Sequence, residues 1–217
     1  MAVADPTLEF EQSLLAAGAR SVIGCDEVGR GALAGPVAVG FAAIDHSVGP
    51  IPVGLRDSKM LSEKRREALA PLAESWVLHS AVGLASAEEV DRLGIIACLG
   101  LAGKRGLVEL HHAGIDVSES VVLLDGNDDW LNKALSTPLR IVTRVKADRD
   151  CASVAAASVI AKVHRDRLMI AADASTPGYG WAGNKGYGSA AHLSAIATRG
   201  ATALHRTSWL KLPSATA

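Results

Sequence analysis

The sequence predicts an α/β fold in which helices flank a central sheet. Short apolar runs typical of strands alternate along the chain with longer stretches typical of amphipathic helices. Hydrophobic residues make up 49% of the chain, and much of this share is alanine, which favours close contact between helices and sheet. With 217 residues and neither an internal repeat nor a low-complexity linker, the chain is expected to form one domain over residues 1–217.

Local signals predict the elements of the first half. A helix is expected at residues 8–17, followed by strands at 22–25 and 36–44, with Gly29, Gly31 and Gly35 in the turn between them. Ser62 suits the N-cap of a helix that reaches about residue 75. The apolar run at 76–84 then predicts another strand.

The second half begins with a capping-box pattern, Ser86 with Glu89, which predicts a short helix ending near Gly94. A longer helix is expected at 95–112, buried-type strands at 120–125 and 139–145, and an alanine-rich helix at 152–172. Glycine and aromatic residues become more frequent after Thr176. The tail, residues 213–217, is expected to be disordered.

Composition excludes several classes of protein. The net charge of −1 argues against a protein that binds nucleic acid through overall positive charge, although a local basic groove remains compatible with it. Cys25, Cys98 and Cys151 are widely spaced and include no CxxC pair, so neither a disulfide framework nor a zinc site is expected. The N-terminus is acidic rather than basic, and no apolar run approaches the ~20 residues of a membrane span. A cytoplasmic protein that does not enter membranes is expected.

Carboxylates follow three of the expected strands. Asp26 and Glu27 come directly after the first, Asp125 ends a later strand, and Asp148 follows the last. Because sites in α/β sheets form at the carboxyl ends of neighbouring strands, the four acids are expected to converge if these strands are adjacent. They would repel one another unless cations bind between them. Two Mg²⁺ or Mn²⁺ ions there could activate a water and stabilise the leaving oxygen of a phosphodiester.

The adjacent pair Asp26 and Glu27 poses a geometric difficulty. Successive side chains of a regular strand face opposite sides, so one of the two is expected to lie where the strand breaks, near Gly29. The step Gly29-Arg30-Gly31 follows, in which glycines allow close main-chain approach to a ligand and arginine suits phosphate. Together these residues predict an enzyme acting on phosphate esters, and the alternative of helix caps and solvated loop acids stays open here.

An ordered set of short segments resembles ribonuclease HII, the bacterial type 2 ribonuclease H family. An ordered set of this kind is far more specific than any one of its members. The resemblance covers about residues 22–210 and is carried by 24–31 and 35–37 (GCDEVGRG, GPV), 57–62 (DSKMLS), 125–126 (DG), 146–148 (KAD), 155–166 (AAASVIAKVHRD), 184–188 (NKGYG) with His192, and 205–208 (HRTS).

This resemblance implies a ribonuclease H-like fold, with a central mixed five-stranded sheet flanked by helices in a core of about residues 20–172. It implies a C-terminal helical extension, about residues 173–212, that forms one wall of the substrate groove. The implied activity is that of an endoribonuclease that hydrolyses the RNA strand of RNA·DNA hybrids. It would also cut 5′ of single ribonucleotides in duplex DNA, leaving a 3′-hydroxyl and a 5′-phosphate. These duplexes are the implied partners.

Site residues follow from the resemblance position by position. The family's catalytic metal-binding acids fall on Asp26, Glu27, Asp125 and Asp148, which would hold two divalent ions, Mg²⁺ or Mn²⁺. Its reader of the ribose 2′-hydroxyl falls on Gly29, Arg30 and Gly31, and the tyrosine that stacks on the sugar after the RNA–DNA junction falls on Tyr187.

Further substrate contacts are weaker candidates. Lys59 and Lys185 could contact phosphate, and Ser62 could assist, although on its own it reads as a helix cap. Asp166 lies four residues after Lys162, which predicts an ion pair within a helix.

Three alternatives differ from this interpretation in features of the sequence. The sister family, ribonuclease HIII, looks similar but carries glutamate at the fourth acidic position and a sizeable N-terminal domain; Asp148 and the short lead-in favour type HII. A non-catalytic binder of hybrids would lack at least one of the four acids. An integrase-like strand transferase would not need the 2′-hydroxyl reader. A monomer is expected, and no extended C-terminal segment that would dock on a sliding clamp is seen.

Overall fold

A mixed sheet of five strands lies at the centre of the computed structural model, which describes residues 5–210. The strand order is β3-β2-β1-β4-β5. β1 pairs antiparallel with β2 and parallel with β4, β2 pairs antiparallel with β3, and β4 pairs parallel with β5. The α/β class and the mixed five-stranded sheet are therefore confirmed. The strands are β1 (Val22–Val28), β2 (Val37–Ile44), β3 (His79–Ala85), β4 (Val121–Asp125) and β5 (Arg140–Arg144).

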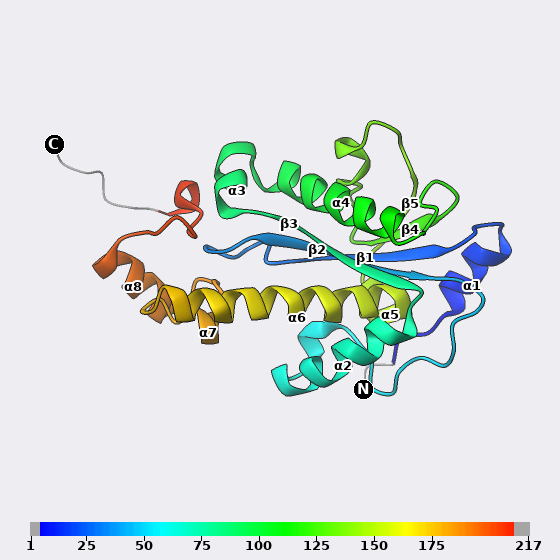
Figure 1. Cartoon of the computed structure of the whole chain (residues 1–217), viewed down its shortest axis with the longest axis horizontal. Coiled ribbons are helices and arrows are strands. Elements are labelled where there is room, and N and C mark those ends of the chain that lie inside the picture. Colours follow the sequence, from blue (N-terminus) through cyan, green and yellow to red (C-terminus); the bar gives the residue numbers. More distant parts are fainter. Residues whose placement is uncertain (1–4, 211–217) are drawn as a thin grey trace.

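Helices cover both faces of this sheet, with α2 and α6 on one side and α3 and α4 on the other (Figure 1). α6 runs along the sheet for 24 residues. The α-helices are α1 (Glu9–Ala16), α2 (Glu63–Trp76), α3 (Ala87–Leu93), α4 (Ile95–His112), α5 (Ala147–Asp150), α6 (Ala152–Ser175), α7 (Trp181–Asn184) and α8 (Ala190–Arg199), and the 3-10 turns are η1 (Ser58–Met60), η2 (Asn132–Ala134) and η3 (Thr207–Trp209).

Small residues bring α6 and α4 close to the sheet. A Cβ atom added at Gly40 would lie 2.6 Å from the carbonyl oxygen of Ala157 on α6. One added at Gly83 would lie 1.9 Å from the carbonyl oxygen of Ala102 on α4. Glycines in the strands, facing alanines in the helices, therefore allow the helix backbones to approach the strands directly.

Helix signals in the sequence correspond to the observed ends. The capping box is present in full: the Ser86 hydroxyl accepts the N–H of Glu89 at 3.1 Å, and the Glu89 carboxylate accepts the N–H of Ser86 at 2.8 Å. Ser62 caps α2. The first strand, however, is longer than predicted, because it continues through Asp26 and Glu27 to Val28. The expectation that one of these two acids lies at a strand break is wrong.

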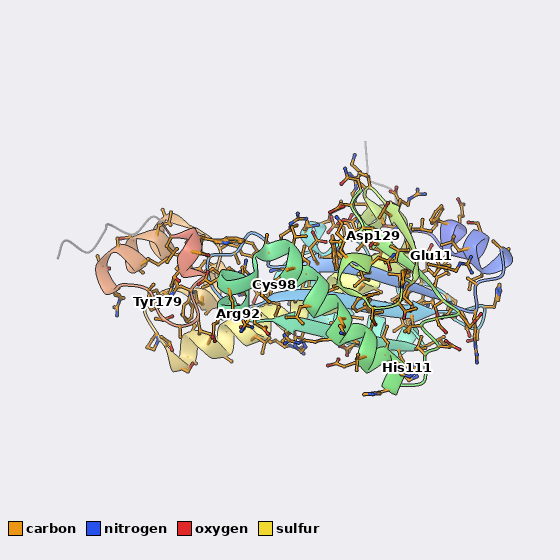
Figure 2. The ribbon with its side chains drawn as sticks, turned by 90° about the horizontal axis from the view of Figure 1, so that it is seen from above. Glu11, Arg92, Cys98, His111, Asp129 and Tyr179 are labelled. Atoms are coloured by element: carbon orange, nitrogen blue, oxygen red, sulfur yellow. The ribbon has the colours of Figure 1, made fainter. Side chains whose placement is uncertain are left out.

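The C-terminal segment packs against the far end of α6. Met169 of α6, Tyr179, Trp181 and Ile196 form a small apolar cluster with Ala34 from the loop after β1. Tyr179 lies at this end of the molecule, and Glu11 lies toward the other end (Figure 2). The predicted disordered tail, residues 213–217, falls outside the described residues.

The described residues also bear on two expectations from composition. All three cysteines, Cys25, Cys98 and Cys151, are free and buried. No helix among residues 5–210 has both the length and the apolar character needed to cross a membrane.

Candidate active site

A pocket opens where β1 outruns its parallel neighbour. The pairing of β1 with β4 ends at Cys25 and Leu124, whereas its pairing with β2 continues to Val28 and Ala38. Beyond Cys25, one edge of β1 is therefore free of a strand. The pocket at this edge measures about 230 Å³ and is lined by Asp26, Glu27, Val28, Gly29, Arg30, Gly31, Ser58, Lys59, Asp125, Lys162 and Tyr187.

This open edge explains how two successive acids serve one site. Asp26 and Glu27 face opposite sides of β1, and both line the pocket because no neighbouring strand separates the two faces there. Asp26 is 2% exposed, while Glu27 is partly exposed. Three of the four predicted acids, Asp26, Glu27 and Asp125, thus line one pocket, and the adjacent pair reaches it from within the strand rather than at a break in it.

Asp26 is the most unusual carboxylate in the pocket. One oxygen accepts the N–H of Glu27 at 2.9 Å, but the other, Oδ2, is buried without a hydrogen-bond partner among the described residues. Burial, assisted by the carboxylates of Glu27 and Asp125 and opposed by the Lys59 ammonium, raises the pKa of Asp26 to about 8. The Asp26 carboxyl group thus has a raised pKa and one buried oxygen without a donor. A cation bound at this oxygen would stabilise the charged form.

Asp125 ends β4 and reaches the pocket from the next strand. Its Oδ1 accepts the N–H of Ala147 at 2.7 Å, which ties the strand end to the start of α5. Burial and the nearby Asp148 carboxylate raise the pKa of Asp125. Glu27 is paired instead with the Arg30 guanidinium, at 3.2 Å.

Asp148, the fourth acid, lies on α5 rather than at a strand end. It is 4% exposed, and its Oδ2 is 2.9 Å from the Nζ atom of Lys59, which η1 presents. Partial burial lowers the pKa of Lys59, but the carboxylates of Asp26 and Asp148 outweigh this effect and hold it above its usual value. A protein cation therefore occupies one side of the acidic cluster.

The oxygen atoms of these acids are ligands of the kind that hard divalent ions prefer, but the side chains lie too far apart to bind one ion together. Oxygen ligands, one of them buried and unpartnered, are what Mg²⁺ and Mn²⁺ prefer. As they lie, no three His, Cys, Asp or Glu side chains within residues 5–210 are grouped closely enough to hold one ion. Two of the acids are paired with protein cations, Glu27 with Arg30 and Asp148 with Lys59. Each of these two carboxylates keeps a second oxygen that could contact a metal ion.

Gly29 and Gly31 occupy very different surroundings. Gly29 has a φ of +80°, and a Cβ atom there would lie 2.1 Å from Nε of Arg165. At Gly31 a Cβ atom would meet no protein atom within 4 Å. The fold itself therefore requires glycine at 29, whereas at 31 it leaves open space in the pocket.

Tyr187 also lines the pocket, and the residue is 38% exposed. The Lys162 ammonium lies 5.9 Å, and the Arg165 guanidinium 5.5 Å, from the centre of its ring. Lys162 also lines the pocket and pairs with Asp166 at 2.5 Å, which is the predicted ion pair within α6.

Two of the weaker candidates lie outside the pocket lining. The Ser62 side chain accepts the N–H of Arg65 at 3.4 Å, as an N-cap does. Lys185 is 5% exposed, and its ammonium donates to the carbonyl of Ala182 and pairs with Glu63 at 3.3 Å. Their roles in substrate binding stay predictions.

Sequence reasoning did not assign Ser58, Lys162 or Arg165 to the site. Ser58 lines the pocket and its hydroxyl accepts from Ser158 at 2.8 Å. All three lie in segments that carry the family resemblance, and that was the only available signal, because no local pattern distinguishes a pocket lysine from a solvated one.

Comparisons with known proteins identify the family of this chain. The sequence model of the family described as Ribonuclease HII matches residues 23–212. The ribonuclease HII of Streptomyces griseus is 47% identical over 211 residues, covering 95% of this chain and 85% of that protein.

Two solved structures are similar in fold. The RNase HII of Archaeoglobus fulgidus, solved as a PCNA:RNase HII complex, superposes with a TM-score of 0.69 and 27% identity, covering 90% of this chain and 98% of that one. Bst-RNase HIII in complex with Mn²⁺ gives a TM-score of 0.68 and 26% identity, covering 87% and 67%. This chain therefore belongs to the ribonuclease HII family, metal-dependent endoribonucleases that cleave the RNA of RNA–DNA hybrids.

Proposed function

We propose that this chain cuts on the 5′ side of a ribonucleotide, both in RNA·DNA hybrids and at single ribonucleotides embedded in duplex DNA. The products would carry a 3′-hydroxyl and a 5′-phosphate. The observation that carries the proposal is one pocket that unites Asp26, Glu27 and Asp125 with Gly29–Gly31 and Tyr187. Acids alone would suit many nucleases, whereas a group that contacts the 2′-hydroxyl is needed only where RNA must be distinguished from DNA.

Asp26, Glu27, Asp125 and Asp148 would hold two divalent ions, Mg²⁺ or Mn²⁺. When bound, these ions would supply Lewis-acid activation of a water and stabilisation of charge on the leaving oxygen. The unpartnered Oδ2 of Asp26 supports this assignment. Lys59 lines the pocket and pairs with Asp148, so it would exchange that carboxylate for a substrate phosphate oxygen.

Recognition of the ribose would come from the main chain at residues 29–31. The open space beside Gly31 admits a sugar at van der Waals distance, which any Cβ atom would obstruct. Tyr187 would pack its partly exposed ring on the neighbouring deoxyribose, with Lys162 behind the ring. The C-terminal segment would thus form one wall of the groove within a single domain. We propose that the protein acts as a monomer in the cytoplasm, and its three free, buried cysteines agree with a reducing compartment.

The test compares two duplexes of one sequence, one with a single ribonucleotide and one of DNA alone, each with Mg²⁺, with Mn²⁺ and with chelator. Cleavage is expected at the ribonucleotide only, and only with metal. Equal cleavage of the all-DNA duplex would refute the proposed specificity.

A second arm of the test uses carboxylate-to-amide variants. Asp26→Asn is expected to abolish cleavage while retaining duplex binding. Glu109→Gln, the same change at an exposed position on α4, serves as the control and should cut at the wild-type rate. Near wild-type cleavage by Asp26→Asn would refute the metal assignment.

A further inference from the structure

Two buried arginines lie beneath the loop that carries Gly29–Gly31. Arg165 on α6 and Arg206 before η3 are each 0% exposed. Within residues 5–210, no carboxylate forms an ion pair with either guanidinium. Burying a charge without a counterion is unfavourable unless its N–H groups are satisfied, so their partners are informative.

Arg206 donates only to main-chain carbonyls of this loop. Its Nη2 donates to the carbonyl of Gly29 at 2.8 Å, and its Nη1 donates to that of Arg30 at 2.9 Å. Both Nε and Nη2 reach the carbonyl of Gly35, at 3.3 and 3.2 Å. One planar guanidinium thereby joins the two ends of the loop.

These bonds, together with a turn bond from the N–H of Ala32 to the carbonyl of Gly29 at 3.2 Å, fix where the loop's N–H groups point. In a trans peptide the carbonyl of one residue and the N–H of the next point in opposite directions, and no cis peptide occurs among the described residues. Because the carbonyls of Gly29 and Arg30 point toward Arg206, the N–H groups of Arg30 and Gly31 point away from it. Neither N–H donates to any group in residues 5–210, and both residues line the pocket.

Arg165 and Trp209 support this arrangement from two sides. Arg165 donates to the carbonyls of Pro36 at 2.8 Å, Ala34 at 3.0 Å and Lys185 at 2.9 Å, which joins the same loop to the segment that carries Tyr187. The Trp209 ring lies 4.9 Å from the guanidinium carbon of Arg206. Burial and the adjacent Arg165 lower the pKa of Arg206 to about 10, so it remains charged at neutral pH.

From these contacts we infer that Arg206 is a positioning residue for ribose recognition: it holds the peptides of Gly29–Arg30 and Arg30–Gly31 so that two free N–H donors face the substrate's 2′-oxygen. This inference rests on the proposed function. It names the N–H groups of Arg30 and Gly31 as the donors that contact the 2′-hydroxyl, and Arg206 as the residue that holds them in place. A merely structural arginine would close the loop without influencing discrimination between ribose and deoxyribose.

The test uses Arg206→Lys, which keeps the charge but replaces the planar fork of N–H donors on three nitrogen atoms with a single ammonium nitrogen. Trp209→Leu is a milder second variant that keeps the guanidinium and removes the ring beside it. Tyr179→Phe is the matched control, because it keeps the ring and removes only a hydroxyl, which donates to the carbonyl of Gly200 in the same C-terminal segment and forms no hydrogen bond with the loop.

The first readout needs no activity: the amide ¹⁵N–¹H signals of Arg30 and Gly31. These signals are expected to shift or broaden in Arg206→Lys, to shift less in Trp209→Leu, and to stay in place in Tyr179→Phe. Unmoved signals in a folded Arg206→Lys protein would overturn the inference, whatever the enzyme does.

The second readout is kcat/KM on the single-ribonucleotide duplex, measured beside the Kd for the all-DNA duplex. Arg206→Lys is expected to lower the former about tenfold, as expected for weakening of one or two hydrogen bonds, and to change the latter less than about twofold. Equal losses on both duplexes, or a loss matched by Tyr179→Phe, would reduce Arg206 to a structural role. Failure of the wild-type protein to cut the ribonucleotide duplex would instead refute the proposed function, and the amide signals would still decide the positioning claim.

Discussion

Alanine at Gly29 and alanine at Gly31 are expected to have opposite effects, although the two positions are only two residues apart. Gly29→Ala places a methyl group where φ is +80° and where Nε of Arg165 lies 2.1 Å away. Gly31→Ala places the same methyl group where no protein atom lies within 4 Å. The first substitution should therefore lower the stability of the fold, and the second should affect only how the substrate is bound and cut.

The magnitudes follow from these surroundings. For Gly29→Ala, the left-handed conformation costs roughly 1–2 kcal/mol and overpacking against a buried side chain roughly 1–3 kcal/mol more. For a domain of this size each 1 kcal/mol lowers Tm by about 2–4 °C, so a loss of roughly 4–20 °C is expected. Gly31→Ala should leave Tm unchanged or raise it slightly, because alanine restricts the unfolded chain by about 0.4–1 kcal/mol.

Thermal melts and cleavage of the single-ribonucleotide duplex, measured on both variants, check this reasoning. Gly31→Ala is expected to keep its stability and lose most of its kcat/KM on that duplex. If it cuts as well as the wild type, no sugar approaches Gly31 and the proposed recognition is wrong. If Gly29→Ala melts at the wild-type temperature, the clash with Arg165 has been misjudged.

Three more outcomes are expected. Burial raises the pKa of Glu11 above 4.5, so the free energy of unfolding should fall as pH rises from 4.5 through the folded-state pKa. Glu11→Gln keeps an acceptor for the Ser153 hydroxyl and N–H. In thermal melts at about pH 4–7, this variant should therefore show a weaker dependence of stability on pH. Mn²⁺ at about 100 times its Kd should raise the wild-type Tm by roughly 5–10 °C but barely change that of Asp26→Asn; equal shifts would contradict the metal assignment. Tyr187→Ala should lower kcat/KM on the ribonucleotide duplex roughly tenfold with little change in Tm, since the residue is 38% exposed; a large drop in Tm would point to a packing role.

Local sequence signals predicted a helix or strand well where its formation depends on residues close together in the sequence. The capping box at Ser86 and Glu89 needs only residues three apart, and both of its hydrogen bonds are present. The helix expected from residue 95 to about residue 112 is observed at Ile95–His112, because Gly94 precedes it and the apolar pattern continues without interruption. The end of β1 was missed because a strand's length depends on its partners, and β2 pairs with it as far as Val28.

The sequence also identified the candidate acids, but it did not predict their ion pairs or their pKa values. Asp26, Glu27, Asp125 and Asp148 were expected to converge, and the first three line one pocket. Lys59 pairs with Asp148, which lies 89 positions away in the sequence. No pattern of residue spacing predicts a contact over such a separation. The pKa of Asp26 likewise depends on burial, which belongs to the folded chain alone.

What the sequence by itself determined is the α/β class, the family and the identity of the candidate acids, because each depends on residue types in a fixed order. Only the tertiary structure decided that β1 outruns β4, which opens the pocket on both faces of a strand. It alone revealed that Arg206, some 176 residues from Arg30, satisfies its buried charge on the carbonyls of that loop. The physical reason is that hydrogen bonds and burial depend on distances in space, which the chain order does not specify until the fold has formed.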